Sequence, residues 1–419
     1  MHSRLSLIVA LAISTLITQR TIVEAGVCRK KASKGFQISG YYPSYRAGLL
    51  PPESIPWDLY NHIDYFVAVT SESPSAEFVF DNEANIKAVV EGAKAHKVTV
   101  SLTIGGWTGS KYFSSLVSTD SSRETFAKTI SSTLTKYGFD GVDLDWEYPN
   151  APGNEGNIIS KDDSANLLKF LTALRAAIGS KRLTAAVSVH GFMGPDGQYL
   201  KDHKEYAKLF DFITIMAYDI YLPVVTPLFG PGAPLFDTCN DPSYKFSVAQ
   251  AIDTWTSTGF PASQILLGIP AYGYQYTLSS STLDPTNFSG KEKSLFFGPI
   301  DKSAQAQTVK NVAPTPTGCD SPLEGGNFIF KDLLTCGYLS PDAATGQGGF
   351  ERHYDNCTQT PLLFNPSTKT LIAYDDPTSL TEKVKYAKSK GVAGVNVFDA
   401  SGDTPSRMLL KSVNQASKL

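Results

Sequence analysis

The residues of this chain best suited to acid–base chemistry lie in the segment DGVDLDWEYP, residues 140–149. Alternate residues of an extended strand share a face, which places Asp143, Asp145 and Glu147 together, roughly 7 Å from one to the next. The residues between them are apolar and share the opposite face. Carboxylates buried side by side lose hydration and repel one another, so at least one of their pKa values rises. The pattern therefore predicts a general acid that is protonated near neutral pH.

Two other interpretations of the acidic segment are weaker. A strand that merely exposes its acids to water is disfavoured by the apolar residues around them. Oxygen ligands would also suit magnesium or calcium, but no phosphate-binding motif accompanies them. The HExxH and GxSxG patterns of zinc proteases and serine hydrolases are absent. We therefore predict a site with no metal and no cofactor.

Regular hydrophobic patterning predicts the elements that must position these acids. Eight β-rich segments are expected as strands, at 36–42, 62–69, 98–104, 140–146, 183–189, 212–217, 265–269 and 394–398. Amphipathic spacing predicts helices at 83–96, 121–137, 162–178, 246–258 and 379–390. The runs Asp120-Ser121-Ser122 and Asp162-Asp163-Ser164 are predicted helix starts, because their short polar side chains can cap free N–H groups.

Eight strands alternating with helices predict an α/β fold, a (β/α)8 TIM barrel. A doubly wound open sheet is the alternative, but it would need a glycine-rich nucleotide turn after the first strand, and none is present. Barrel enzymes carry their chemistry at the C-terminal ends of the strands, where Glu147 lies. Asp140 lies at the entrance of the same strand and on its other face, so we predict a structural role for it.

One stretch, residues 275–372, interrupts the alternation and is rich in Pro, Gly, Ser, Thr and aromatic residues. A structureless loop of this length is improbable in a compact domain, so we predict a small α+β insertion after the seventh strand. Residues 26–274 and 373–419 then form the barrel. Three of the five cysteines, Cys319, Cys336 and Cys357, are close in sequence, and at least one disulfide is expected in that region.

The N-terminus predicts export from the cell. An apolar run from residue 5 to about residue 17 follows Arg4, and residues 1–25 have the layout of a cleaved signal peptide. No other segment approaches the ~20 apolar residues that span a membrane. The final tripeptide, Ser417-Lys418-Leu419, matches a peroxisomal address, but a signal peptide acts before this tripeptide is made. We therefore expect a secreted, extracellular protein.

Charge and composition indicate the kind of partner. The net charge is −3 and no stretch is rich in lysine and arginine, so nucleic acid is an unsuitable partner and a neutral substrate fits better. A monomer is expected. Sequons at Asn287 and Asn356 permit glycosylation.

The acidic run resembles the D-x-x-D-x-D-x-E signature of glycoside hydrolase family 18, with its four positions filled by Asp140, Asp143, Asp145 and Glu147. Three further segments resemble strand motifs of the same family. They are SLTIGGW at 101–107, with Thr103 in a usual serine position, MAYD at 216–219 and GIPAYG at 268–273. The insertion also resembles that of secreted fungal chitinases.

This resemblance implies a retaining mechanism in which the N-acetyl oxygen of the substrate attacks instead of an enzyme carboxylate. Glu147 would protonate the leaving oxygen and later activate water. Asp145 would orient the acetamide group, and Asp143 would hold Asp145 and adjust its proton. Tyr218 would bind the acetamide carbonyl oxygen, and Asp219 would contact the distorted sugar.

Further substrate contacts follow from the resemblance. Trp107 and Tyr148 could stack on sugar rings, although each could instead pack in the core. Met216 would pack beneath the sugar, and Gly106 belongs to the glycine pair of the third-strand motif. The family commonly has a tryptophan at the end of the eighth strand, where this chain has Phe398, so a smaller apolar floor and weaker binding are expected.

Three functions remain in view. The first is an endochitinase-like enzyme that hydrolyses β-1,4-linked N-acetylglucosamine in chitin and chitooligosaccharides. The second is an endo-β-N-acetylglucosaminidase acting on N-glycans by the same chemistry. The third, favoured only by Phe398, is a chitin-oligosaccharide-binding protein with little turnover. The retained Glu147 favours catalysis.

Overall fold

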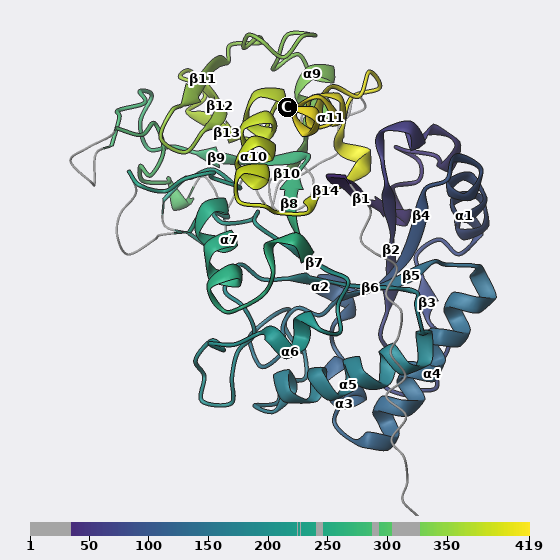
Figure 1. Ribbon diagram of the computed structural model, residues 1–419. Helices are drawn as coiled ribbons and strands as arrows, with labels where there is room; N and C mark the ends of the chain where they lie inside the picture. Colours follow the sequence, from purple (N-terminus) through teal and green to yellow (C-terminus); the bar gives the residue numbers. More distant parts are fainter. Residues whose placement is uncertain (1–34, 224, 227, 240–245, 287–292, 304–326) are drawn as a thin grey trace, which may run out of the picture.

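Eight parallel strands form the centre of the computed structural model, which describes residues 35–223, 225–226, 228–239, 246–286, 293–303 and 327–419 (Figure 1). The strands are β1 (Gln37–Pro43), β2 (His62–Val69), β4 (Thr99–Gly105), β5 (Gly141–Asp145), β6 (Arg182–Val187), β7 (Phe212–Ile215), β8 (Ile265–Pro270) and β14 (Gly394–Phe398). Because β1 pairs with both β14 and β2, the sheet closes on itself. A short strand, β3 (Val79–Phe80), pairs antiparallel with β2. The predicted TIM barrel is confirmed, and each predicted strand ends within two residues of the observed one.

Helices surround the barrel, and the five predicted ones are present. The α-helices are α1 (Ala84–His96), α2 (Gly106–Gly109), α3 (Phe113–Leu116), α4 (Asp120–Tyr137), α5 (Asp163–Ile178), α6 (Lys204–Ala207), α7 (Val248–Ser257), α9 (Phe330–Thr335), α10 (Pro377–Ser389) and α11 (Met408–Lys418). Short 3-10 helices occur at Ser44–Arg46, Pro52–Ser54, Trp57–Leu59, Ala262–Gln264 and Ala400–Gly402.

The two predicted helix starts are placed correctly, but the capping side chains are not the predicted ones. At α4 the cap is Thr119, whose hydroxyl accepts a hydrogen bond from the Ser122 N–H. At α5 the Asp162 side chain makes no capping bond. The carboxylate of Asp163 turns instead to backbone N–H groups of the preceding loop, at Asn150 and Ser160. Both starts therefore depend on loop geometry that the sequence pattern does not specify.

The main hydrophobic core lies between the barrel and its helices. Outward-facing strand residues such as Leu102, Val142 and Ile213 are fully buried and form one apolar cluster with helix residues such as Ile130 and Leu171. Burying each such side chain contributes about 1.5–3 kcal/mol to folding. This explains why the apolar face of the acidic strand points away from the barrel interior.

The interior of the barrel is polar, whereas barrel interiors are usually filled by branched apolar residues. Buried polar side chains come from seven strands and include Ser39, His62, Asp64, Ser101, Thr103, Asp143, Thr184, Thr214 and Asn396. Buried polar groups cost free energy unless they are hydrogen-bonded. A lumen built this way therefore indicates that its groups serve the chemistry above them.

A second, antiparallel sheet continues from β8, at the top of Figure 1. Its order is β10 (Asn327–Ile329), β9 (Tyr272–Thr277), β13 (Thr370–Ala373), β12 (Thr360–Asn365) and β11 (Glu351–Asp355). With α9 these strands make an α+β unit after the seventh barrel strand. Strand β9 begins at Tyr272, so part of the segment assigned to the barrel from sequence lies in this sheet.

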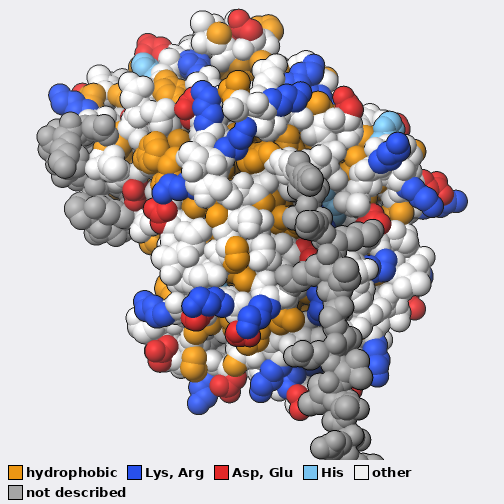
Figure 2. All heavy atoms as spheres, in the orientation of Figure 1, with side chains coloured by type: hydrophobic (Ala, Val, Ile, Leu, Met, Phe, Trp, Pro, Cys, Tyr) orange, Lys and Arg blue, Asp and Glu red, His pale blue; other side chains and the backbone are white. Residues whose placement is uncertain are grey.

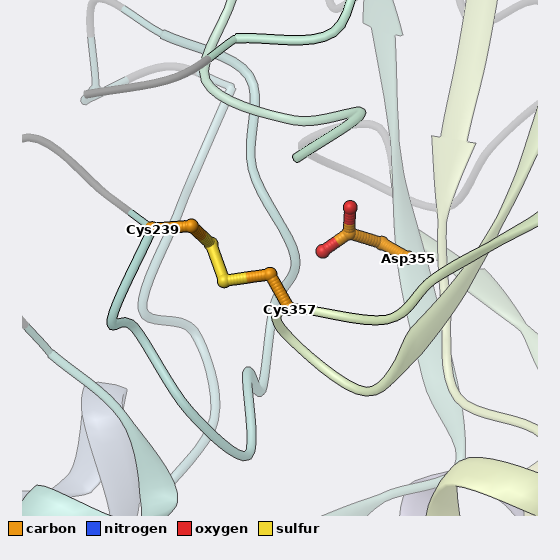
Figure 3. Close-up of side chains that lie close together, drawn as sticks. All are labelled: Cys239, Asp355 and Cys357. Atoms are coloured by element: carbon orange, nitrogen blue, oxygen red, sulfur yellow. A yellow bond between two sulfur atoms is a disulfide. The ribbon is translucent and has the colours of Figure 1, made fainter. Parts of the chain in front are cut away.

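A disulfide between Cys239 and Cys357 joins the segment after β7 to the turn between β11 and β12 (Figure 3). The link spans 118 residues, and a chain-entropy estimate for such a loop is about 4–5 kcal/mol. Cys357 therefore pairs outside the cysteine group in which a bridge was expected. Cys336 is also disulfide-bonded.

Asp355 lies beside this disulfide, and the three side chains are close enough to suggest a metal site (Figure 3). The two sulfur atoms are bonded to each other. The Asp355 carboxylate accepts hydrogen bonds from the Leu295 N–H and from the N–H and hydroxyl of Thr358, at 2.7–2.8 Å. These donors occupy the oxygens that a cation would need, so the cluster braces the insertion.

The signal peptide at 1–25, Cys28, Asn287 and Cys319 fall outside the described residues. Within the described part, Asn356 is exposed beside the disulfide. No helix among the described residues has the length and apolar character to cross a membrane.

Candidate active site

The acidic strand β5 carries its carboxylates from the barrel interior up to the C-terminal mouth. Asp143 and Asp145 are buried, with 1% and 4% of their surface accessible. Glu147 lies two residues beyond the strand end and is partly accessible. Asp140 precedes the strand, and its carboxylate accepts a hydrogen bond from the Val100 N–H at 2.9 Å. That bond ties neighbouring strands together at the bottom of the barrel, which is a structural role.

Within the acidic segment, Asp143 is the carboxylate with the most hydrogen bonds. The hydroxyls of Thr184, Tyr41 and Thr103 donate to it, at 2.6, 3.2 and 3.2 Å. Burial raises the pKa of Asp143 to about 7, the negative charge of Asp64 adds to the rise, and the three hydroxyls oppose it. Three hydrogen-bond donors and no acceptor contact the Asp143 carboxylate, so its surroundings suit a negatively charged group.

Asp145 has the opposite environment. Its Oδ1 is buried and has no hydrogen-bond partner in the part of the chain that the structure describes. Burial, followed by the charges of Glu147 and Asp143, raises the pKa of Asp145 well above its usual value. A buried oxygen without a partner is rare in folded proteins and marks a place where a ligand can supply the missing donor.

Ser110 holds the backbone around these acids. Its hydroxyl donates to the carbonyl oxygens of Gly106 and Asp145 and accepts from the Glu147 N–H, at 2.8–3.0 Å. The Asn157 side chain donates to the Glu147 carbonyl oxygen at 2.9 Å. Sequence reasoning missed both residues, because each acts on the backbone of a distant segment and belongs to no motif.

Glu147 combines a raised pKa with access to the cavity. Burial and the nearby charge of Asp219 raise its pKa to about 7, and a hydrogen bond with Tyr148 opposes the rise. A carboxyl group in this state retains its proton up to neutral pH, and can both donate and accept a proton there.

The segment after β7 supplies the opposite wall. The Tyr218 ring is buried, faces the charges of Asp145, Asp219 and Glu147, and has a pKa raised well above its usual value, mainly by burial. Asp219 has a left-handed backbone, with φ of 59°. Its carboxylate accepts hydrogen bonds from the hydroxyls of Tyr272 and Tyr274, at 2.5 and 2.7 Å. The insertion sheet thus orients a residue of the barrel mouth.

A cavity of about 580 Å³ connects these groups. Six of the predicted site residues line it: Trp107, Glu147, Tyr148, Met216, Tyr218 and Asp219. Asp143 and Asp145 lie beneath it, and Gly106 and Phe398 lie beside it. Trp107 is 51% exposed, so its ring is free to contact a ligand and is not part of the core.

Gly106 is required by the backbone. Its φ is 76°, and a Cβ atom there would meet the Phe66 ring at 3.0 Å and the Asp145 carboxylate at 3.8 Å. Any side chain at this position would therefore be strained and would press against the Phe66 ring.

The far end of the cavity is aromatic and was not predicted. His190 stacks on Tyr199 with ring centroids 5.1 Å apart, and Phe246 contacts His190 edge-on at 4.6 Å. All three line the cavity. Burial lowers the pKa of His190, which favours a neutral imidazole. His190 and Tyr199 lie close together in the sequence, but Phe246 lies in a separate segment, so no single local pattern predicts the cluster.

Comparison with known proteins agrees with this geometry. The family model for glycosyl hydrolases family 18 matches residues 37–403. The chain belongs to glycosyl hydrolase family 18. It is therefore a glycoside hydrolase by descent, and its four signature acids occupy one barrel strand and its two ends.

Individual relatives cover most of this family 18 chain. A chitinase-like effector of Moniliophthora roreri is 35% identical over 377 residues, which are 89% of this chain and 91% of that protein. Chitinase A1 of Niallia circulans is 30% identical, and the matched region is 72% of this chain and 40% of that protein. A crystal structure of a chitinase from Rhizomucor miehei is 30% identical, with a TM-score of 0.77, and covers 91% of this chain and 99% of that one.

Phe398 is where this family 18 chain departs from the usual tryptophan. The ring lies at the end of β14 and stacks on Tyr218, with centroids 5.7 Å apart and planes inclined by 28°. It also contacts Tyr41, Phe66 and Tyr272 edge-on. The phenylalanine thus supports Tyr218 from beside the cavity.

Proposed function

We propose that this family 18 enzyme hydrolyses β-1,4 linkages of N-acetylglucosamine in chitin and chitooligosaccharides, with Glu147 as acid and base. The observation that carries the proposal is Glu147 at the cavity wall, with a pKa raised to about 7, above the unpartnered buried oxygen of Asp145. Chitinases among the relatives support the choice of substrate.

The reaction follows from the positions of the two groups. Glu147 donates its proton to the glycosidic oxygen as the bond to the sugar carbon breaks. The acetamide carbonyl oxygen of the same sugar bonds to that carbon and forms an oxazolinium ion. Asp145 accepts the acetamide N–H at its free oxygen, and its charge stabilises the ion. Water then attacks the carbon, the bond between that carbon and the acetamide oxygen breaks to restore the N-acetyl group, and Glu147 takes a proton from the attacking water.

Substrate assistance is supported by the shortage of a second free carboxylate. Among the described residues that line the cavity, the carboxylates are Glu147 and Asp219, and two tyrosine hydroxyls hold Asp219. An enzyme nucleophile in a retaining glycosidase would lie about 5 Å from the acid and be free to attack. The acetamide oxygen of the substrate fills this role.

The stereochemistry of the product tests this mechanism. The first reducing sugar released from chitohexaose is expected to be the β-anomer, because two displacements at one carbon restore its configuration. Proton NMR during the first minutes, before the anomers equilibrate, measures the ratio. An initial excess of the α-anomer would rule out the proposed mechanism.

A binding protein with little turnover is the second candidate, favoured by the relative described as a chitinase-like effector. A turnover assay on a chromogenic chitobioside separates the two. Binding of chitohexaose without measurable hydrolysis, by folded protein, would favour the second candidate and overturn the first.

We also propose that the protein is secreted. The predicted signal peptide at 1–25 and the disulfide between Cys239 and Cys357 support this, because disulfides persist in oxidising compartments. Expression of the full chain with its own N-terminus tests it: the protein should accumulate in the medium and begin near residue 26.

Tyr199 is expected to contribute to binding of long substrates. It is 38% exposed and presents one ring face at the far end of the cavity. Removing such an aromatic contact costs about 0.5–1.5 kcal/mol, so Tyr199→Ala should lower kcat/KM for chitohexaose about threefold to tenfold. Turnover of the short chromogenic chitobioside should stay unchanged, and Tyr199→Phe should keep parent activity on both. Equal losses on both substrates would contradict a role in subsite binding.

A further inference from the structure

A third buried carboxylate lies in the barrel lumen and takes no part in the mechanism above. Asp64 of β2 has 2% of its surface accessible. In the sheet register it lies opposite Tyr41 of β1 on one side and Ser101 of β4 on the other. Both neighbours face the lumen, and the Tyr41 hydroxyl donates to Asp143 at 3.2 Å. Asp64 thus lies one layer beneath the acidic strand.

Neutral donors hold Asp64 in place. His62 Nε2 lies 3.0 Å from Oδ1, and Asn396 Nδ2 donates to Oδ2 at 2.9 Å. Because a carboxylate oxygen only accepts, Nε2 is the donor of a neutral imidazole, and Nδ1 then accepts from the Thr99 hydroxyl at 2.6 Å. Burial, reinforced by the charge of Arg182, lowers the pKa of His62, so the imidazole is neutral. Two neutral donors bind this carboxylate without adding a positive charge beside it.

Arg182 of β6 is the cation of the lumen. Its guanidinium lies over the Phe212 ring, 4.7 Å from the centroid. A Cβ atom on Gly141 would lie 2.6 Å from the Arg182 Cβ, so the glycine of the acidic strand makes room for this residue. The Arg182 charge is shared among Asp64, Asp211 and Asp143, and it cannot neutralise all of them.

The groups that face Asp143 therefore include neutral hydrogen-bond donors, negatively charged carboxylates and one positively charged guanidinium. Tyr41, Thr103 and Thr184 donate hydrogen bonds from β1, β4 and β6. The charged or titratable groups are Asp64 from β2, Asp145 from β5 and Arg182 from β6. After burial, the charge of Asp64 is the largest influence that favours a proton on Asp143.

We propose that Asp64 is a positioning residue that sets the lower pH limit of the reaction, because its fixed negative charge opposes the charge that Asp143 must carry. This inference rests on the proposed function, in which negative charge on Asp143 and Asp145 stabilises the oxazolinium ion. As the pH falls, Asp143 gains a proton and this stabilisation is lost. Burial, reinforced by the repulsion from Asp64, makes that loss begin near neutral pH instead of near pH 4.

The proposal predicts that removing the Asp64 charge increases activity at low pH. Asp64→Asn removes the charge and keeps the shape, so the pKa of Asp143 should fall. The acid limb of kcat/KM on a chromogenic chitobioside should then move down by roughly half to one and a half pH units. On that limb, kcat/KM should rise about threefold to thirtyfold. The alkaline limb should stay in place, because it reports Glu147, whose main influences do not include Asp64.

Two further variants test the direction in which the acid limb moves and whether any change in the barrel lumen is enough to move it. Arg182→Met removes the lumen cation and should move the acid limb upward, and it carries the test if Asp64→Asn does not fold. Ser39→Ala changes a lumen hydroxyl that donates to the Val395 carbonyl oxygen and should leave both limbs unchanged. A folded Asp64→Asn protein with the parent acid limb, or with a uniform loss at every pH, would overturn the proposal.

A second readout separates this inference from the proposed function. The infrared absorption of protonated carboxyl groups can be titrated in the parent and in Asp64→Asn, with Asp143→Asn used to assign the band. If no variant hydrolyses the substrate, the proposed function fails. A downward shift of the Asp143 band in Asp64→Asn would still support the role of Asp64, and an unchanged band would refute it.

Discussion

Replacing Glu147 by glutamine is expected to lower turnover of a chromogenic chitobioside by at least about a thousandfold, near the upper range of general acid–base contributions. Glutamine is similar in size but has no proton to donate at neutral pH. The Ser110 and Asn157 bonds to the Glu147 backbone do not involve the side chain, so the site should keep its shape. Steady-state turnover at pH 6 measures the effect.

Oligosaccharide binding should survive this substitution, because Trp107, Tyr148 and Tyr218 still line the cavity. Calorimetric titration with chitohexaose should give a Kd within about threefold of the parent. Glu155→Gln is the matched control, since Glu155 is exposed in the loop that follows, and it should keep full turnover. A Glu147→Gln protein that turns over at a rate close to the parent would contradict the assignment of Glu147 as the general acid.

Replacing Asp145 by asparagine is expected to lower turnover about a hundredfold to a thousandfold and to stabilise the folded protein above pH 7. The activity falls because no charge remains next to the oxazolinium ion. Stability rises because Asp145 is buried with an unpartnered oxygen, and its pKa in the folded protein is raised well above the usual value.

The sign follows from linkage. A raised pKa means that the folded protein holds a proton that the unfolded chain has released. The stability that this proton contributes is complete below pH ~4 and is lost as the pH rises toward the folded pKa. Because asparagine does not ionise, the Asp145→Asn protein does not lose this stability as the pH rises. Thermal unfolding at pH 5 and pH 8 should therefore give a Tm gain for Asp145→Asn that is larger at pH 8. A smaller gain at pH 8 than at pH 5 would contradict the stated environment of Asp145.

The two predictions describe one trade-off. Asp145 keeps an oxygen unpaired and a charge buried, which costs stability, so that a substrate N–H can bind there. Asp143 is bound by three hydroxyl donors, and its charge beside Asp145 adds to the rise of the Asp145 pKa. The acidic strand is therefore less stable than a neutral strand in the same place.

Local pattern was enough to predict the barrel and the acids. The eight strands and five helices follow from spacing of apolar residues along single segments, and the shared face of Asp143, Asp145 and Glu147 follows from strand parity. The helix caps were predicted wrongly, because Thr119 and Asp163 bond according to the loops that precede them.

The sequence by itself was enough to predict the residues of the proposed chemistry: Glu147 at the strand end, the two aspartates on its face, and the aromatic and acidic residues of the MAYD segment. Only the tertiary structure decided what surrounds them. Asn396 and Asp64, 332 residues apart, meet only because the barrel closes in one register. The Cys239–Cys357 bridge and the contact of Phe246 with His190 likewise join segments that are distant in the sequence. A contact across the barrel depends on the register and packing of separate strands, which no single segment of sequence encodes.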